Sequence, residues 1–179
     1  MQKKAKVAEL KETEWKLIRE LMKNCRRSDR ELARDIGSSQ PTVSRTRQRL
    51  EKKGYIREYA MIPDFGKLGL DIMAFTFIRY KKEMTPEEYR KVKEAAKEFE
   101  QKFPKPFIMA LKGMGLGFDR IIVSFHEDYS SYVEMMNLMR QLPFTAVTDA
   151  QSFLVSLDDT EHYQPFTFSK MAEYLLPKK

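Results

Sequence analysis

The stretch GSSQPTVSRTRQRLEKKGYI, residues 37–56, constrains this chain more than any other segment. Ser39 suits a helix N-cap, Pro41 is tolerated in a first helical turn, and the following glycine suits a helix end, so the stretch predicts one helix. On a helical wheel Val43 and Leu50 face inward, whereas most basic side chains face outward. A helix that is anchored on one side and basic on the other suits the major groove of DNA.

Two shorter helices precede this one. Residues 13–25 predict a helix capped by Thr13, and residues 28–37 predict a helix that stops at Gly37. The first helix has one apolar stripe, made of Leu17, Ile18, Leu21 and Cys25. The second opens with a capping-box pair, Ser28 and Glu31. Two helices joined by a tight glycine turn are typical of a helix-turn-helix, and the β-prone residues 55–63 suit a wing.

Positive charge is confined to this part of the chain. The 179 residues carry a net charge of +7. Residues 1–63 hold 17 Lys+Arg against 9 Asp+Glu, a net of +8, whereas residues 64–179 hold 16 against 17, a net of −1. Such an excess favours an anionic partner, either nucleic acid or a membrane surface. A basic helix face alone is more often merely solvated, but its place in a helix-turn-helix favours double-stranded DNA.

The expected DNA contacts come from the outward side of this third helix and its first turn. They are Ser39, Gln40, Thr42, Ser44, Arg45, Gln48, Arg49 and Lys52. The centre of the outward face, Ser44, Arg45 and Gln48, is expected to read base edges. Arg49 and Lys52 are expected to contact phosphates.

The compartment follows from what the sequence lacks. A single cysteine cannot form an intramolecular disulfide, no apolar run reaches the roughly 20 residues of a membrane span, and the first residues lack the apolar core of a signal peptide. We expect a cytoplasmic, nucleoid-associated protein without membrane contact.

The rest of the chain predicts a second module. A linker at residues 64–70 is followed by alternating segments: strand 70–80, helix 85–103, strands 106–113 and 118–125, helix 128–142 and strand 144–157. This βαββαβ order predicts a ferredoxin-like sandwich, with two helices on one face of an antiparallel sheet. The expected fold is therefore α+β, with domains at 1–63 and 71–158 and a tail at 159–179 of open role.

The other face of this sheet needs a cover. Large apolar residues recur along all four strands: Phe75, Phe77, Ile108, Ile122 and Phe153. Apolar groups left exposed in a monomer argue for a homodimer formed through the sheets.

The chain resembles the Lrp/AsnC family of prokaryotic transcription regulators. The resemblance covers about residues 10–157 and is most specific in ELARDIGSSQPTVSRTRQRLEKKGYI followed by YAMIPDFGKLG. It implies a DNA-binding regulator that dimerises through its second module, assembles in some relatives into tetramers or octamers, and in many members senses an amino acid between subunits.

Two positions depart from the family. Arg47 stands where relatives have an apolar residue, and we expect it to extend toward solvent. The family's effector turn often reads G-x-x-D, whereas here Leu116 lies three residues before Asp119. By resemblance the effector residues would be Gly113, Gly115, Gly117 and Asp119, with Asp119 available for an ammonium group. We expect weak or no binding of common amino acids, and a plain hairpin is the alternative for these glycines.

An enzyme is the competing class. His126 and His162 lack the spacing of a zinc site, Cys25 fits a helix core better than a nucleophile, and no nucleotide-binding fingerprint occurs. We therefore expect no catalytic residue, cofactor or metal. Some proteins similar to the family act on tetrapyrroles, which leaves a tetrapyrrole-modifying enzyme as the alternative.

Overall fold

The structure is a computed structural model that describes residues 10–81, 83–102, 107–141, 147–159 and 167–175. The chain forms two compact units, one from residues 1–62 with 165–179 and the other from residues 63–164. The first boundary lies one residue before the expected one. The last residues, expected as a separate tail, belong to the first unit.

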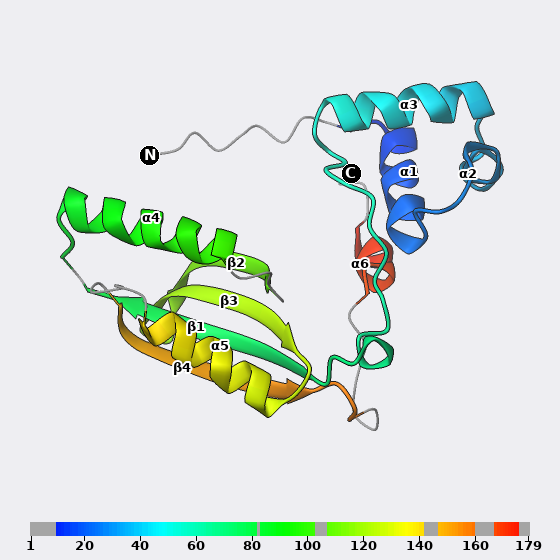
Figure 1. Cartoon of the computed structure of the whole chain (residues 1–179). Coiled ribbons are helices and arrows are strands. Elements are labelled where there is room, and N and C mark those ends of the chain that lie inside the picture. The colour runs from blue at the N-terminus through cyan, green and yellow to red at the C-terminus, as the bar shows by residue number, and fades with distance from the viewer. Residues whose placement is uncertain (1–9, 82, 103–106, 142–146, 160–166, 176–179) are drawn as a thin grey trace. The chain divides into compact units, whose positions relative to one another are not determined.

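The first unit is built on three helices, α1 (Glu12–Lys23), α2 (Asp29–Ile36) and α3 (Gln40–Lys52). Their apolar sides meet in one core, made of Leu17, Leu21, Leu32, Ala33, Ile36, Val43 and Leu50. Ser28 and Glu31 form the expected capping box of α2, and Gly37 ends it at a φ of 68°. This left-handed residue turns the chain directly into α3, so the helix-turn-helix is present (Figure 1).

Two expectations for α1 are wrong. Thr13 does not cap the helix, because α1 already begins at Glu12 and the backbone N–H of Lys11 donates to the Glu14 carboxylate at 2.7 Å. A glutamate in the third helical position commonly accepts from the N–H of the N-cap residue, so this part of the helix start needs no hydroxyl. Cys25 lies beyond the end of α1 and is only half-buried.

No strand forms where a wing was expected, at residues 55–63. A strand needs a neighbour to pair with, and this segment finds none among the described residues. The backbone N–H of Tyr55 instead donates to the carbonyl of Leu50 at 2.9 Å, and the hydroxyl of Tyr59 donates to Glu51 at 2.6 Å. The segment is therefore held to the end of α3 without a sheet.

The end of the chain completes the first unit. Helix α6 (Ser169–Tyr174) contacts α1. Ala172 is fully buried, and its carbonyl accepts a hydrogen bond of 2.8 Å from Nε of Arg19.

The second unit is the expected sandwich. Its elements are β1 (Ile72–Tyr80), α4 (Pro86–Lys102), β2 (Phe107–Gly115), β3 (Phe118–His126), α5 (Tyr129–Gln141) and β4 (Val147–Ser156). The antiparallel strands lie in the order β2-β3-β1-β4, which is the ferredoxin-like arrangement (Figure 1). This confirms the α+β fold class. Residues 103–106 and 142–146, where some expected ends fall, lie outside the described residues.

Strand register shows that both helices cover one face. The side chains of Lys112 and His126 lie on the same face of the sheet. Lys112 contacts Tyr89 of α4, and His126 contacts Tyr132 of α5. Ile122 lies opposite Thr76 and also belongs to this helix face, so it does not share a face with Phe75 as a common open patch would require.

The opposite face is only partly covered. Phe153 is 66% exposed and Leu111 is 54% exposed. Phe125 on this face stacks against Phe65, with ring centroids 4.0 Å apart. Phe65 precedes the short helix η1 (Gly66–Leu68), so the segment 64–70, expected as a linker, is attached to the sheet through Phe65.

Candidate DNA-binding surface and ligand pocket

Helix α3 has a buried side and an exposed side, as its sequence predicts. Val43, Thr46 and Leu50 are buried. Six of the expected contact residues are exposed on the helix: Gln40, Thr42, Arg45, Gln48, Arg49 and Lys52. Ser44 is half-buried, and Ser39 is exposed just before the helix.

The hydroxyl groups at the start of α3 serve the helix itself. The side chain of Ser39 accepts a hydrogen bond of 3.3 Å from the backbone N–H of Thr42. The two hydroxyl oxygens lie 2.8 Å apart. Ser39 is therefore the N-cap, as expected, and both hydroxyls are already engaged within the protein.

Arg49 also has a partner inside the protein. Its Nη2 lies 2.9 Å from Oε1 of Glu14, a residue only 5% exposed. The pair joins α3 to α1, so Arg49 is tied to the scaffold by one of its nitrogens and keeps other donors for a phosphate.

The remaining exposed polar residues of α3 are free to bind another molecule. Within the described part of the chain, Arg45, Gln48 and Lys52 make no side-chain hydrogen bond or ion pair with the protein. Their spacing of three, four and seven residues places them along one side of the helix. A free cation, a free amide and a second free cation thus lie in a row on the exposed surface.

Arg47 does not extend toward solvent, contrary to expectation. Its side chain is 19% exposed, and Nη2 lies 2.5 Å from Oδ1 of Asp29 at the start of α2. The same nitrogen donates to the carbonyl of Arg27 at 3.4 Å, and the guanidinium lies 5.8 Å from the ring centre of Tyr59. The site is largely shielded from solvent, which strengthens the attraction between the Arg47 guanidinium and the Asp29 carboxylate and favours this pair over hydration of Arg47.

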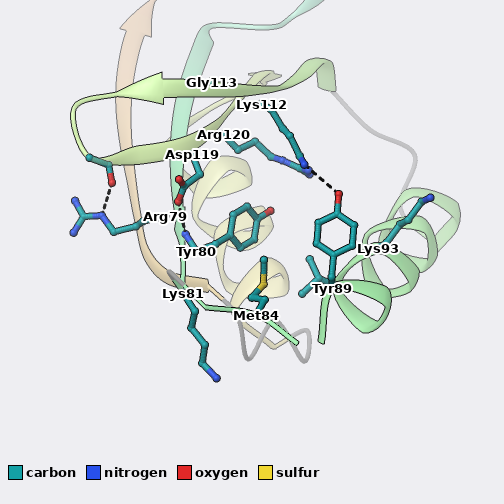
Figure 2. A pocket seen from close by; sticks show the side chains of 12 residues that line it. Arg79, Tyr80, Lys81, Met84, Tyr89, Lys93, Lys112, Gly113, Asp119 and Arg120 are labelled. Atoms are coloured by element: carbon teal, nitrogen blue, oxygen red, sulfur yellow. Dashed lines mark hydrogen bonds between the residues drawn. The ribbon is translucent and has the colours of Figure 1, made fainter. Parts of the chain in front are cut away.

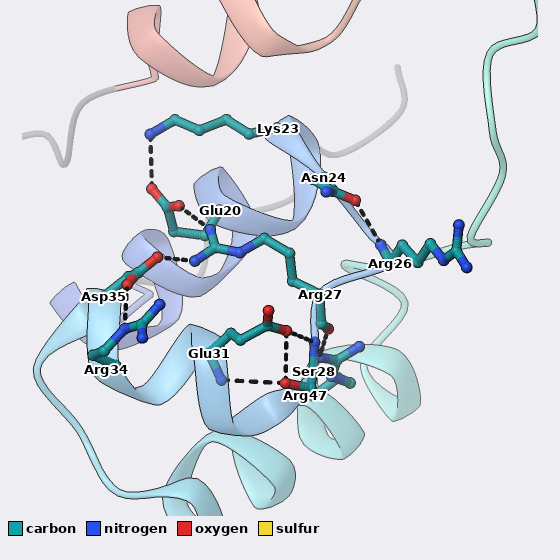
Figure 3. Close-up of polar contacts among 10 residues, drawn as sticks. All are labelled: Glu20, Lys23, Asn24, Arg26, Arg27, Ser28, Glu31, Arg34, Asp35 and Arg47. Carbon is teal, nitrogen blue, oxygen red and sulfur yellow. Dashed lines mark hydrogen bonds and ion pairs between the residues drawn. The ribbon is translucent and has the colours of Figure 1, made fainter.

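A second arginine joins the first two helices. Arg27 makes a bond of 2.6 Å with Glu20 of α1 and an ion pair with Asp35 of α2 (Figure 3). The side chain of Arg27 is 19% exposed. Arg27 and Arg47 together fix the orientation of α2 and α3, which positions the exposed side of α3.

In the second unit, the glycine-rich stretch forms a tight hairpin turn between β2 and β3. Leu116 and Gly117 have φ angles of 52° and 77°, and Gly115 pairs with Phe118 on either side of them. Positive φ at both central residues matches a two-residue hairpin turn of the primed type. The carbonyl of Gly117 accepts a hydrogen bond of 2.6 Å from Nε of Arg79.

A cavity of about 670 Å³ lies beside this turn, between the sheet and α4. Of the expected effector residues, Gly113, Gly117 and Asp119 line it, whereas Gly115 does not. One oxygen of Asp119 accepts a hydrogen bond of 2.8 Å from the backbone N–H of Tyr80 (Figure 2). Asp119 is thus partly engaged rather than fully available for an ammonium group.

The sequence reasoning missed most of the side chains in this cavity. Five are cationic: Arg79, Lys81, Lys93, Lys112 and Arg120. Tyr80 and Tyr89 add aromatic walls. Burial raises the pKa of Tyr80, whereas a hydrogen bond from Lys112 lowers the pKa of Tyr89. These aromatic and basic residues are visible in the sequence, but strand register decides whether they lie together beside Asp119.

Of the three residues considered for catalysis, the structure describes His126 and Cys25. His126 is 3% exposed, its Nε2 lies 2.8 Å from the Ser124 hydroxyl, and burial lowers its pKa. Cys25 contacts the carbonyl of Ala60 at 3.6 Å. His162 lies outside the described residues. Among the described residues no group of His, Cys, Asp and Glu is arranged to hold a metal ion.

Comparison with known proteins independently identifies the helix-turn-helix of the first unit. Residues 10–57 match the winged helix-turn-helix DNA-binding family. An HTH-type transcriptional regulator of Pyrococcus horikoshii is 36% identical over 98 residues, and the leucine-responsive regulatory protein of Rhizobium meliloti is 36% identical over 73 residues. These matches span 55% and 41% of this chain but only 60% and 47% of the two relatives.

Solved structures share the fold over nearly the whole chain. An AsnC family transcriptional regulator from Agrobacterium tumefaciens aligns with a TM-score of 0.73 at 20% identity, covering 93% of this chain and all of the regulator. The regulator NMB0573 of Neisseria meningitidis, solved in complex with L-Met, aligns with a TM-score of 0.68 at 21% identity, covering 90% and 99%. None of these matches favours a tetrapyrrole enzyme. No helix within the described ranges is long and apolar enough to cross a membrane. The first unit thus matches the winged helix-turn-helix DNA-binding family, and the chain shares its fold with solved regulators of the AsnC type.

Proposed function

We propose that the protein is a transcription regulator that binds double-stranded DNA through α3. The observation that carries the proposal is the row of Arg45, Gln48 and Lys52, which are exposed and unpaired within the described residues. These side chains project from a helix whose other side is locked into a core and whose neighbours hold it by ion pairs. Guanidinium and amide groups on such a helix suit base edges, and ammonium groups suit phosphates.

The residues divide by role. Arg45, Gln48 and Ser44 face the base edges in this proposal, and Lys52 contacts a phosphate. Ser39, Gln40 and Thr42 lie at the helix N-terminus, where backbone N–H groups favour a phosphate. Arg49 contacts a phosphate with the donors that Glu14 leaves free.

The proposed assembly is a homodimer through the open face of the sheet. Exposed Phe153 and Leu111 on that face supply apolar area that a second copy would bury. A two-fold dimer presents two copies of α3 to half-sites about one helical turn apart, or a multiple of it. Larger assemblies, such as tetramers or octamers, would extend the number of half-sites, and the protein would act in the cytoplasm on the nucleoid.

Selection of bound sequences from a random DNA pool, followed by gel shifts, tests the proposal. Arg45→Ala should weaken binding to the selected site by roughly 1–3 kcal/mol and leave binding to random DNA almost unchanged. Lys52→Ala should weaken both DNAs similarly and reduce the salt slope by about one unit. Lys91→Gln on α4 is the matched control and should change neither. Equal losses on both DNAs for Arg45→Ala and Lys52→Ala would contradict the assigned roles, and absence of an enriched site would contradict the function.

A small-molecule effector is part of the proposal. The neighbour from Neisseria was solved with L-Met, and the cavity beside the β2–β3 hairpin is of a size that holds a small molecule. Because Leu116 stands where relatives have glycine, a thermal-shift screen of the twenty common amino acids should show little stabilisation. Strong stabilisation by one of them, abolished by Asp119→Ala, would reverse this expectation.

A further inference from the structure

The cavity of the second unit contains positive charge that its own residues do not neutralise. Its described lining includes five lysine and arginine side chains but only one carboxylate, that of Asp119. Two of the five have partners: Arg79 lies near Asp149, at 3.9 Å, and Lys81 pairs with Glu88 at 3.1 Å.

Three cations remain without a carboxylate partner in the described part of the chain: Lys93, Lys112 and Arg120. Two of them, Lys112 and Arg120, extend into one region of the cavity, whereas the end of Lys93 points away from it (Figure 2). Nζ of Lys112 donates to the Tyr89 hydroxyl at 3.1 Å, and Figure 2 shows Arg120 extending toward the same place. The region is therefore one of concentrated positive potential.

Two of these cations are direct neighbours across the sheet. Lys112 of β2 lies opposite Arg120 of β3 in the strand register. Like charges directly opposite each other destabilise a sheet. Nε of Arg120 is buried and has no acceptor among the described residues, although its guanidinium lies 5.7 Å from the ring centre of Tyr80. An anion placed beside both side chains would relieve this repulsion.

The walls of the cavity suit the organic part of such a ligand. Tyr80, Met84 and Val92 provide apolar surface beside the cations. A free ammonium group would meet Lys112 and Arg120, and the one carboxylate in the described lining, that of Asp119, already accepts a hydrogen bond from the backbone of Tyr80. The charge of the site thus opposes a zwitterionic amino acid and favours a ligand with excess negative charge.

We propose that this cavity binds a small organic molecule that carries two negative charges on oxygen atoms, held between Lys112 and Arg120. The shared chemistry is that of a phosphate ester or a dicarboxylate. The inference rests on the proposed function for its regulatory meaning: the ligand would be the effector of the regulator. The binding site itself rests on the contacts above.

Isothermal titration calorimetry on the full-length protein at constant ionic strength tests the site. The probes are inorganic phosphate, succinate, glycine and L-methionine. We expect no binding of glycine or L-methionine. We expect saturable binding of inorganic phosphate if the natural ligand is a phosphate ester, or of succinate if it is a dicarboxylate. Lys112→Gln and Arg120→Gln should each weaken that binding about tenfold or more, since each removes a charged hydrogen bond. Lys91→Gln, which removes an exposed charge from α4 outside the cavity, should leave binding unchanged.

A second measurement guards against misfolded variants. In buffer free of polyvalent anions, Lys112→Gln should raise the melting temperature of the second unit, because it removes the repulsion of Arg120. A lowered melting temperature would overturn the like-charge argument. Binding of L-methionine without binding of either dianion, or dianion binding that Lys112→Gln leaves intact, would overturn the proposal.

Gel shifts with the same Lys112→Gln protein separate this inference from the proposed function. The variant should bind the selected DNA like the wild type in the absence of ligand, because Lys112 lies outside the helix-turn-helix unit. Normal DNA binding by the wild type without dianion binding would refute the cavity proposal alone. Dianion binding without any DNA binding by the wild type would refute the regulator alone.

Discussion

Nη2 of Arg47 lies 2.5 Å from Oδ1 of Asp29, and this ion pair joins the middle of α3 to the first residue of α2. Both side chains are less than a quarter exposed, at 19% and 24%. The pair therefore stands between an exposed salt bridge, which contributes little, and a fully buried one, whose disruption costs several kcal/mol.

The Arg47–Asp29 pair should be measurable in a double-mutant cycle. Arg47→Ala and Asp29→Ala should each lower the free energy of unfolding, with a coupling energy of roughly 1–2 kcal/mol. Urea unfolding followed by fluorescence of Trp15, the single tryptophan, reports this unit specifically. Arg47→Leu should lower the free energy of unfolding less than Arg47→Ala does, because leucine keeps apolar contacts with the residues that surround the aliphatic part of Arg47. Additive single losses would show that the pair contributes nothing.

Docking of α6 should stabilise the first unit. Ala172 is fully buried, so Ala172→Glu would force a carboxylate into the contact with α1 and lower the free energy of unfolding by roughly 1–3 kcal/mol. Thermal melts followed by Trp15 fluorescence measure this loss. Glu173→Ala changes the exposed neighbouring residue and should have little effect. An unchanged melt for Ala172→Glu would mean that α6 does not pack on α1 in solution.

Short-range chemistry explains what the sequence could predict. Ser28, Glu31 and Ser39 act through hydrogen bonds to backbone within three residues, so their roles are visible without a fold. The strand expected at residues 55–63 does not form, because a strand depends on a partner that local sequence does not specify. The prediction that Arg47 extends toward solvent was wrong for a related reason. Asp29 lies eighteen residues away, and only the packing of α2 on α3 brings the two charges together.

The cavity was hidden by a shift in strand register. Counting back from the Gly115–Phe118 pair at the turn would place Lys112 opposite Ile121. An irregularity between Lys112 and Gly115 instead pairs Lys112 with Arg120. A shift of one residue moves a side chain to the other face of a sheet, so simple hairpin geometry would have separated the two cations.

Stability should depend on pH through His126. Burial lowers the pKa of this residue below its ordinary value of 6.5, so the unfolded chain binds its proton at a higher pH than the folded protein does. Protonation therefore favours unfolding: stability is full above about pH 7 and falls as the pH decreases through 6.5 toward the lower pKa of the folded state. His126→Gln should flatten this part of the profile in urea unfolding. A wild-type profile that is level between about pH 7.5 and 5.5 would contradict the burial argument.

The hairpin turn carries a residue that its backbone disfavours. Leu116 has a φ of 52°, is 83% exposed and precedes Gly117 with a φ of 77°. Asn-Gly is the preferred pair for a turn with two positive φ angles, because asparagine tolerates this conformation better than a bulky side chain does. Leu116→Asn should therefore stabilise the hairpin by about 0.5–1.5 kcal/mol, since it relieves strain and removes little packing.

Hydrogen exchange of peptides from β2 and β3, measured by mass spectrometry, should slow in this variant. Met114→Asn is the control, because Met114 is fully exposed within β2 and asparagine is disfavoured in strands. Faster exchange in Leu116→Asn than in the wild type would show that Leu116 makes contacts that outweigh the strain of its backbone.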